Sequence, residues 1–177
     1  MNERRGLLFY TILTYFNLVF ATLMVTSIIL ILPFAFSQPA MLFQVFLLTG
    51  VVLYSFSSYR FLQKGLKQSQ VFRSGFSDFI KVNDFVALFF LFQSLGDLFE
   101  IILNKDMIAR FMDAFFAQTS DVVSDMTQAE QKKLKGALVS IIYIIVWGLI
   151  VYNLSLLTHV LFSFRFIKKN PQLFEKK

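Results

Sequence analysis

The residues best suited to chemistry lie in one stretch where polar side chains recur at helical spacing. Gln93, Asp97, Glu100 and Asn104 are separated by four, three and four positions, and we call them the polar stripe. A helix would carry all four on one face. Two carboxylates on such a face could bind a cation, exchange protons or contact basic side chains. Gly96 lies beside them and could let a neighbouring helix backbone approach closely.

Three interpretations of the polar stripe remain open. The first is an internal salt bridge, in which Glu100 is reached by one of three lysines that follow in the chain. The second is a contact with a basic residue of a partner protein, and the third is a cation or proton site that opens outward. A transporter usually carries its acids near the bilayer midplane beside a broken helix, and neither feature is evident. The three lysines are Lys132, Lys133 and Lys135.

A weaker set of polar residues forms a predicted inner polar face, nearer the cytoplasmic side. It could line a polar cavity, but ordinary hydrogen bonds between membrane helices explain it more simply. His159 is expected near the inner interface as a tethered side chain rather than a proton relay. The members of this face are Asn17, Tyr152, Asn153, Ser155 and His159, with Gly148 beside them. A polar face of the first apolar stretch is expected at Thr11, Tyr15, Thr22 and Thr26.

The composition excludes several kinds of site. The chain has no Cys, which excludes disulfides, thiol catalysis, iron–sulfur clusters and Cys-based zinc sites. Its single His cannot build a multi-histidine metal or haem site. No Gly-rich phosphate loop, His–Glu metal motif or Ser/His/Asp set is present. We therefore expect no catalytic residue, no cofactor and no metal.

The elements that position these residues are predicted to be membrane-spanning helices. Of the 177 residues, 56% are apolar and 16% are charged, against roughly 25% charged in soluble domains. A helix needs about 20 mostly apolar residues to cross the hydrocarbon core. We predict an all-α integral membrane bundle of four transmembrane helices in a single domain. The predicted spans are about 7–34, 40–62, 83–103 and 137–164.

The distribution of positive charge predicts the orientation. The N-terminus, the loop 60–81 and the C-terminal tail hold 12 of the 17 Lys and Arg residues, and the other side holds 5. Lys and Arg concentrate in cytoplasmic loops, so both termini are predicted to be cytoplasmic, in a cytoplasmic (inner) or plasma membrane. Attraction to anionic lipid then explains the net charge of +6 without a nucleic-acid partner.

The outer loop, residues 104–136, is long for a plain connector. Apolar residues recur in it at helical spacing, at Ile108, Phe111, Met112 and Phe115. Thr127 with Glu130 resembles a capping box that opens a helix. We favour a helical outer hairpin that extends the third and fourth spans. The alternative is that residues 106–118 lie in the membrane interface as an amphipathic helix.

Insertion energetics link the polar stripe to a function. The third span has 13 large apolar residues, which favour insertion by about 4–8 kcal/mol, whereas each mid-bilayer Asp costs about 2.5–3.5 kcal/mol. The helix should therefore need partners besides the lipid bilayer. We expect a non-catalytic scaffold, assembly factor or accessory subunit of a larger membrane complex, or a homo-oligomer. The alternative is a small cation or proton transporter or channel that uses the stripe.

Overall fold

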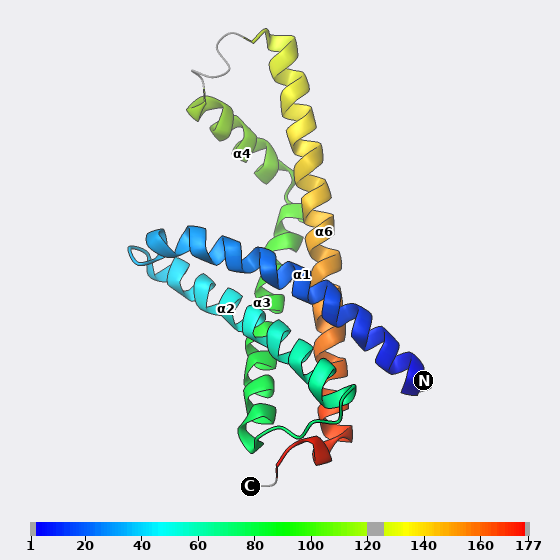
Figure 1. Ribbon diagram of the computed structural model, residues 1–177. Helices are drawn as coiled ribbons and strands as arrows, with labels where there is room; N and C mark the ends of the chain where they lie inside the picture. The colour runs from blue at the N-terminus through cyan, green and yellow to red at the C-terminus, as the bar shows by residue number, and fades with distance from the viewer. Residues whose placement is uncertain (1–2, 120–125, 176–177) are drawn as a thin grey trace. The chain divides into compact units, whose positions relative to one another are not determined.

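The computed structural model describes residues 3–119 and 126–175, and the described chain is built from helices (Figure 1). It contains no strand, only an isolated bridge between Phe72 and Phe174. Four helices are long and apolar enough to cross a membrane. They confirm the all-α prediction and are typical of an integral membrane protein. The candidate spans are Arg4–Ala35, Pro39–Leu66, Gly75–Leu103 and Gln128–Lys169.

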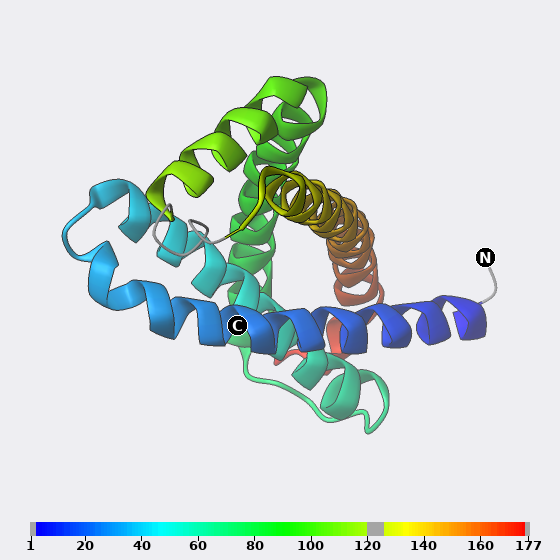
Figure 2. The same cartoon turned by 90° about the horizontal axis from the view of Figure 1, so that it is seen from above.

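Helices α1 (Glu3–Ala35) and α2 (Pro39–Arg60) form an antiparallel hairpin and lie side by side in both views (Figures 1 and 2). The turn between them is closed by a backbone hydrogen bond from Gln38 N to Ala35 O at 3.1 Å. Pro39 opens α2, where a missing N–H removes no helical hydrogen bond. The short polar turn therefore reverses the chain without leaving its backbone unpaired.

The third span begins earlier than predicted. After α2, a π-helical segment, η1 (Phe61–Leu66), leads into a loop in which Ser69 adopts a left-handed φ of 55°. Helix α3 (Ser74–Leu103) then starts nine positions before the predicted boundary at residue 83. Its first turns are polar enough to resemble a loop in sequence, and they fold as helix because Ser77 and Ile80 are buried.

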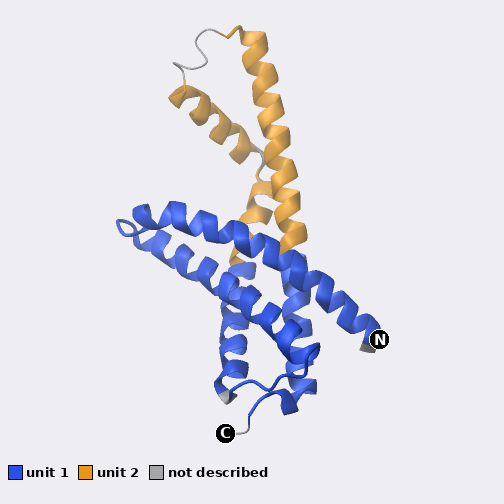
Figure 3. Cartoon of the chain, viewed as in Figure 1, with its two compact units in different colours: residues 1–92, 154–177 blue, residues 93–153 orange. Residues whose placement is uncertain are grey.

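The chain separates into two compact units, each described by itself (Figure 3). Unit 1 contains residues 1–92 and 154–177, and unit 2 contains residues 93–153. Helices α3 and α6 (Gln128–Lys169) each contribute residues to both units. The prediction of a single membrane domain stays a prediction.

Unit 1 contains one notably close helix approach. A Cβ atom built on Gly50 of α2 would collide with Cγ1 of Val86 on α3 and would lie 2.9 Å from the Cβ of Val86. A small residue lets two membrane helices pack this tightly. At Gly96, which belongs to unit 2, a built Cβ meets nothing within 4 Å, so none of the described helices approaches this glycine closely.

Unit 1 also ties the C-terminal tail to the α2–α3 loop. Phe72 N donates to Leu173 O at 2.8 Å, and Glu175 N donates to Phe72 O at 2.9 Å. Beneath these bonds, an apolar cluster holds the tail in place. Its buried members are Phe61, Phe72, Ile80, Ile167 and Leu173. The short 3-10 helix η2 (Pro171–Leu173) turns the chain into this contact.

Unit 2 only partly matches the predicted outer hairpin. Helix α6 runs unbroken for 42 residues from Gln128, and Thr127 N donates to a Glu130 carboxylate oxygen at 2.8 Å. The capping box is thereby confirmed. On the other side, α3 ends at Leu103 and a separate helix, α4 (Lys105–Gln118), follows. The third span therefore does not continue into the loop as one helix.

Candidate functional site

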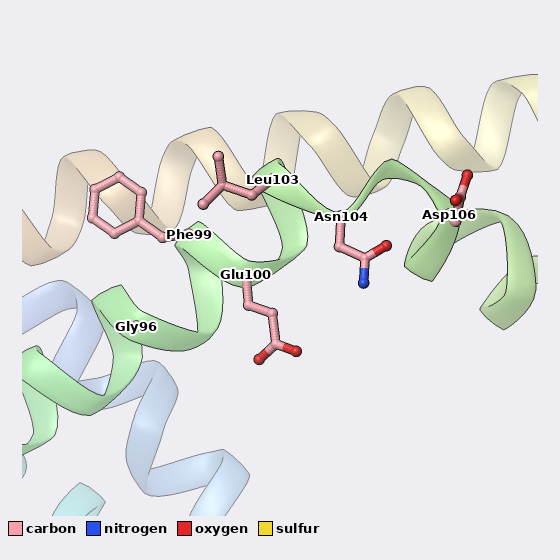
Figure 4. Close-up of a pocket in the computed structure, with 6 residues that line it drawn as sticks. All are labelled: Gly96, Phe99, Glu100, Leu103, Asn104 and Asp106. Atoms are coloured by element: carbon pink, nitrogen blue, oxygen red, sulfur yellow. The ribbon is translucent and has the colours of Figure 1, made fainter.

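Three residues of the polar stripe, Gln93, Asp97 and Glu100, lie on the part of α3 that belongs to unit 2, and Asn104 lies just after the end of this helix. Glu100 and Asn104 point to the same side of the helix, away from Phe99 and Leu103 (Figure 4). Asp97 is exposed as well. An open pocket of about 620 Å³ lies along this surface. It is lined by Gly96, Phe99, Glu100, Leu103, Asn104 and Asp106. Gln93, the first residue of the stripe, is half-buried.

The predicted lysine partners lie elsewhere. Lys135 forms its ion pair with Asp113 of α4, and Lys132 and Lys133 are exposed. Among the side chains that the structure describes, Glu100 forms no ion pair within 4 Å.

A second polar region, in unit 1, surrounds His159 of α6, which is fully buried. Its Nε2 lies 2.8 Å from the Thr14 hydroxyl of α1, and its Nδ1 lies 2.6 Å from the Tyr54 hydroxyl of α2. The Tyr10 ring stacks on the imidazole with centroids 4.7 Å apart. Three helices therefore enclose the ring and hold it by hydrogen bonds, and its predicted position near the inner interface stays a prediction.

One set of donors satisfies all the hydroxyl groups around His159. In this set Thr14 donates its proton to Tyr10 O at 2.7 Å, and its oxygen accepts from His159 Nε2–H. Nδ1 is then the acceptor and Tyr54 the donor. Tyr54 also lies 3.2 Å from Ser163, which lies 2.9 Å from the Tyr10 hydroxyl. A hydrogen-bonded chain thus runs from Tyr10 through Ser163 and Tyr54 to His159.

The face of α1 that contributes to this region differs from the predicted one. Tyr10, Thr14 and Asn17 are buried at helical spacing, whereas Tyr15 and Thr22 are exposed. The other two members of the predicted face also lie outside the core, Thr11 being half-buried and Thr26 exposed. The predicted face is rotated from the buried one by about one residue, roughly 100° on a helix of 3.6 residues per turn.

The structure places the predicted inner polar face in two different units. Asn17, Ser155 and His159 belong to unit 1, and Tyr152 and Asn153 belong to unit 2. All are buried except Ser155, which is half-buried. In unit 2, Asn153 Nδ2 donates to Ser94 Oγ at 3.1 Å and to Leu149 O at 2.8 Å. Gly148 is exposed, with nothing within 4 Å of a built Cβ.

Sequence reasoning missed Asp84 of α3. Its side chain is fully buried, and among the described residues neither carboxylate oxygen has a hydrogen-bond partner. The Ser58 hydroxyl and both polar atoms of the Asn17 amide are also buried without a hydrogen-bond partner among the described residues. Asp84 lies within electrostatic range of Tyr10 and Tyr54. The predicted span began at Asn83, which placed Asp84 at a helix end, whereas α3 begins at Ser74.

The two regions differ in what they can do chemically. The polar stripe offers exposed carboxylate and amide groups to an external partner. The second region, which we call the buried polar cluster, can hold protons on groups shielded from solvent. Its members are Tyr10, Thr14, Tyr54, Asp84, His159 and Ser163. Within residues 3–119 and 126–175, no group of three or more His, Cys, Asp or Glu side chains is placed to hold a metal ion.

Comparison with protein-family models, with curated protein sequences and with solved structures finds no match to this chain.

Proposed function

We propose that the chain is a non-catalytic multi-pass membrane protein that acts as a scaffold, assembly factor or accessory subunit of a larger membrane complex. The observation that carries this proposal is the exposure of Asp97 and Glu100 on a helix long and apolar enough to span a membrane. We further propose that both termini face the cytoplasm, in a cytoplasmic or plasma membrane.

The cost of placing the stripe in lipid supports a protein partner. A charged carboxylate at mid-bilayer costs about 2.5–3.5 kcal/mol, and less nearer the interface. Lys135, one of the three lysines predicted to reach Glu100, is paired with Asp113 instead. A partner helix with a Lys, Arg or amide side chain at the depth of Glu100 would supply the missing donors. Membrane interhelical hydrogen bonds contribute about 0.6 kcal/mol on average, so several contacts would be required.

Helix α4 offers a second contact surface close in sequence to the stripe. Ile108 and Met112 are buried, while Met107, Phe111 and Phe115 are exposed. Exposed aromatic side chains are enriched in the energetically important centres of protein interfaces. The same residues could instead enter the membrane interface, and the experiment below distinguishes the two uses.

The test combines site-specific photo-crosslinking with purification in mild detergent. A photoreactive amino acid replaces Phe99 or Leu103, which lie beside Glu100 in the pocket. The same probe at the exposed Phe46 of unit 1 is the control. We expect a protein adduct from the pocket positions, and a particle much heavier than one 20.5 kDa chain. The adduct should be lost in the Asp97→Asn, Glu100→Gln double variant and retained in Asp113→Asn. A monomeric particle with lipid adducts only would refute the proposal.

The open pocket at Glu100 also favours a second candidate, a small cation or proton transporter or channel that uses the stripe. In proteoliposomes, the Asp97→Asn, Glu100→Gln variant should then abolish ion flux carried by the wild-type chain. Flux that is unchanged in this variant would remove the stripe from any transport mechanism.

A further inference from the structure

We propose that Asp84 is an intramembrane proton-binding site, set beside the hydrogen-bonded chain that runs from Tyr10 to His159. This site is separate from the polar stripe and does not depend on the proposed docking function. The group that binds the proton is then a buried acid of α3 in unit 1, and not one of the exposed acids of unit 2.

The first argument is the state of the Asp84 side chain. Its exposed fraction is 0%, and neither oxygen has a hydrogen-bond partner in the described chain. An ionised carboxylate in such surroundings loses its hydration without compensation, at a cost of several kcal/mol. Uptake of one proton removes the charge. The reaction is simple, because one O–H bond forms on a carboxylate oxygen, the proton comes from water, and no electron is transferred.

The second argument is that the neighbouring groups supply no counter-charge. The titratable groups of the buried polar cluster are Tyr10 from α1, Tyr54 from α2 and His159 from α6. Among the described residues His159 forms no ion pair with Asp84, and its ring nitrogens pair with the hydroxyls of Thr14 and Tyr54. On α3 itself, Lys81 is occupied by an ion pair with Asp78. A proton is therefore the species that most directly neutralises Asp84.

The third argument favours a proton over a metal cation. Hard cations require about six or more oxygen ligands, whereas a proton needs one lone pair. A protonated Asp84 would also become a donor. The Ser58 hydroxyl, itself buried without a hydrogen-bond partner among the described residues, lies near Tyr10 and Tyr54, which are also within electrostatic range of Asp84.

The chain of hydroxyls offers a proton route within unit 1, and no hydrogen bond among the described residues joins it to Asp84. When Tyr54 donates to His159, Ser163 donates to Tyr54 and Tyr10 donates to Ser163. Reversal of these donors transfers a proton between the two ends of the chain without moving any heavy atom. Acids and histidines within a membrane commonly mark proton relays.

The test is infrared spectroscopy of the full chain in lipid nanodiscs at about pH 6, where ordinary carboxyl groups, with a pKa of roughly 4, are ionised. We expect one carboxylic-acid carbonyl band that shifts when aspartate is labelled with heavy carbon. The band should vanish in Asp84→Asn and persist in Asp97→Asn, which alters the same residue type on the exposed part of α3.

A conservative variant keeps the test decisive if Asp84→Asn does not fold. In Asp84→Glu, the acid band should remain but should no longer shift with labelled aspartate. Tyr54→Phe should change the frequency of the wild-type band, because it removes a neighbouring hydroxyl. The absence of any acid band at about pH 6 in the folded wild-type chain, or a label-sensitive band that survives in a folded Asp84 variant, would overturn the proposal.

Discussion

The close approach at Gly50 makes a quantitative prediction about the Gly50→Ala variant. The added methyl group would meet Cγ1 of Val86 in a collision and would lie 2.9 Å from its Cβ. Valine has one strongly preferred side-chain rotamer in a helix, so Val86 cannot simply rotate away. The α2 and α3 backbones must separate, or the side chains must remain strained.

The expected loss of stability combines two opposing effects. Overpacking a tight interface costs about 1–3 kcal/mol, while alanine favours a helix over glycine by about 0.8–1.0 kcal/mol. Gly50→Ala should therefore lower the free energy of unfolding by about 0–2 kcal/mol. At Gly96 and Gly148 a built Cβ meets nothing within 4 Å, so their alanine variants should gain up to about 1 kcal/mol. The difference between Gly50→Ala and either control isolates the packing cost, about 1–3 kcal/mol.

The assay is denaturant unfolding in one mild detergent, followed by helical circular dichroism. A double-mutant cycle with Val86→Ala tests the named contact, because that change removes the colliding Cγ1 and leaves only the Cβ. We expect a favourable coupling free energy of about 0.5–3 kcal/mol between Gly50→Ala and Val86→Ala. Equal stability changes at Gly50, Gly96 and Gly148, or no coupling with Val86, would refute the reasoning.

Three further predictions concern the buried polar cluster, the tail contact and the α6 cap. Tyr54→Phe should destabilise the chain by about 1–3 kcal/mol, because it leaves a buried imidazole nitrogen of His159 without its hydrogen-bond partner. In the same unfolding assay the control Tyr15→Phe, which alters an exposed ring, should change the stability little. Phe72→Ala should cost about 3–5 kcal/mol and speed hydrogen exchange in residues 170–175, unlike Phe92→Ala at an exposed position. Thr127→Ala should cost about 0.5–2 kcal/mol and speed exchange in the first turn of α6.

The features that sequence predicted well are those that depend on local composition. A long uninterrupted apolar stretch requires hydrocarbon surroundings whatever its neighbours are, so the four long apolar helices could be identified without a structure. The Thr127–Glu130 capping box is equally local, since both partners lie within one helical turn. The start of α3 was missed because the polar residues before Asn83 resemble a loop.

The features that sequence predicted poorly depend on which face of each helix is buried. In a soluble protein, the apolar face of a helix identifies the core. Lipid is as apolar as the side chains that pack between membrane helices, so apolar residues do not distinguish the two faces here. The choice of Thr11, Tyr15, Thr22 and Thr26 on α1 followed the residues with hydroxyl groups. The buried face instead contains Tyr10 and Thr14, whose side chains form hydrogen bonds to α6.

The two aspartates of α3 are the same residue type in different surroundings, and we therefore propose different functions for them. Asp97 is exposed in unit 2, where an external basic or amide group could compensate its charge. Asp84 is buried in unit 1 without a hydrogen-bond donor from the described residues, so no external protein group can reach it while the helices remain packed. Neutralising Asp97 should therefore affect association with a partner and leave protonation inside unit 1 unchanged. Replacing Asp84 should do the reverse, and a variant of either residue that altered both properties would contradict this separation.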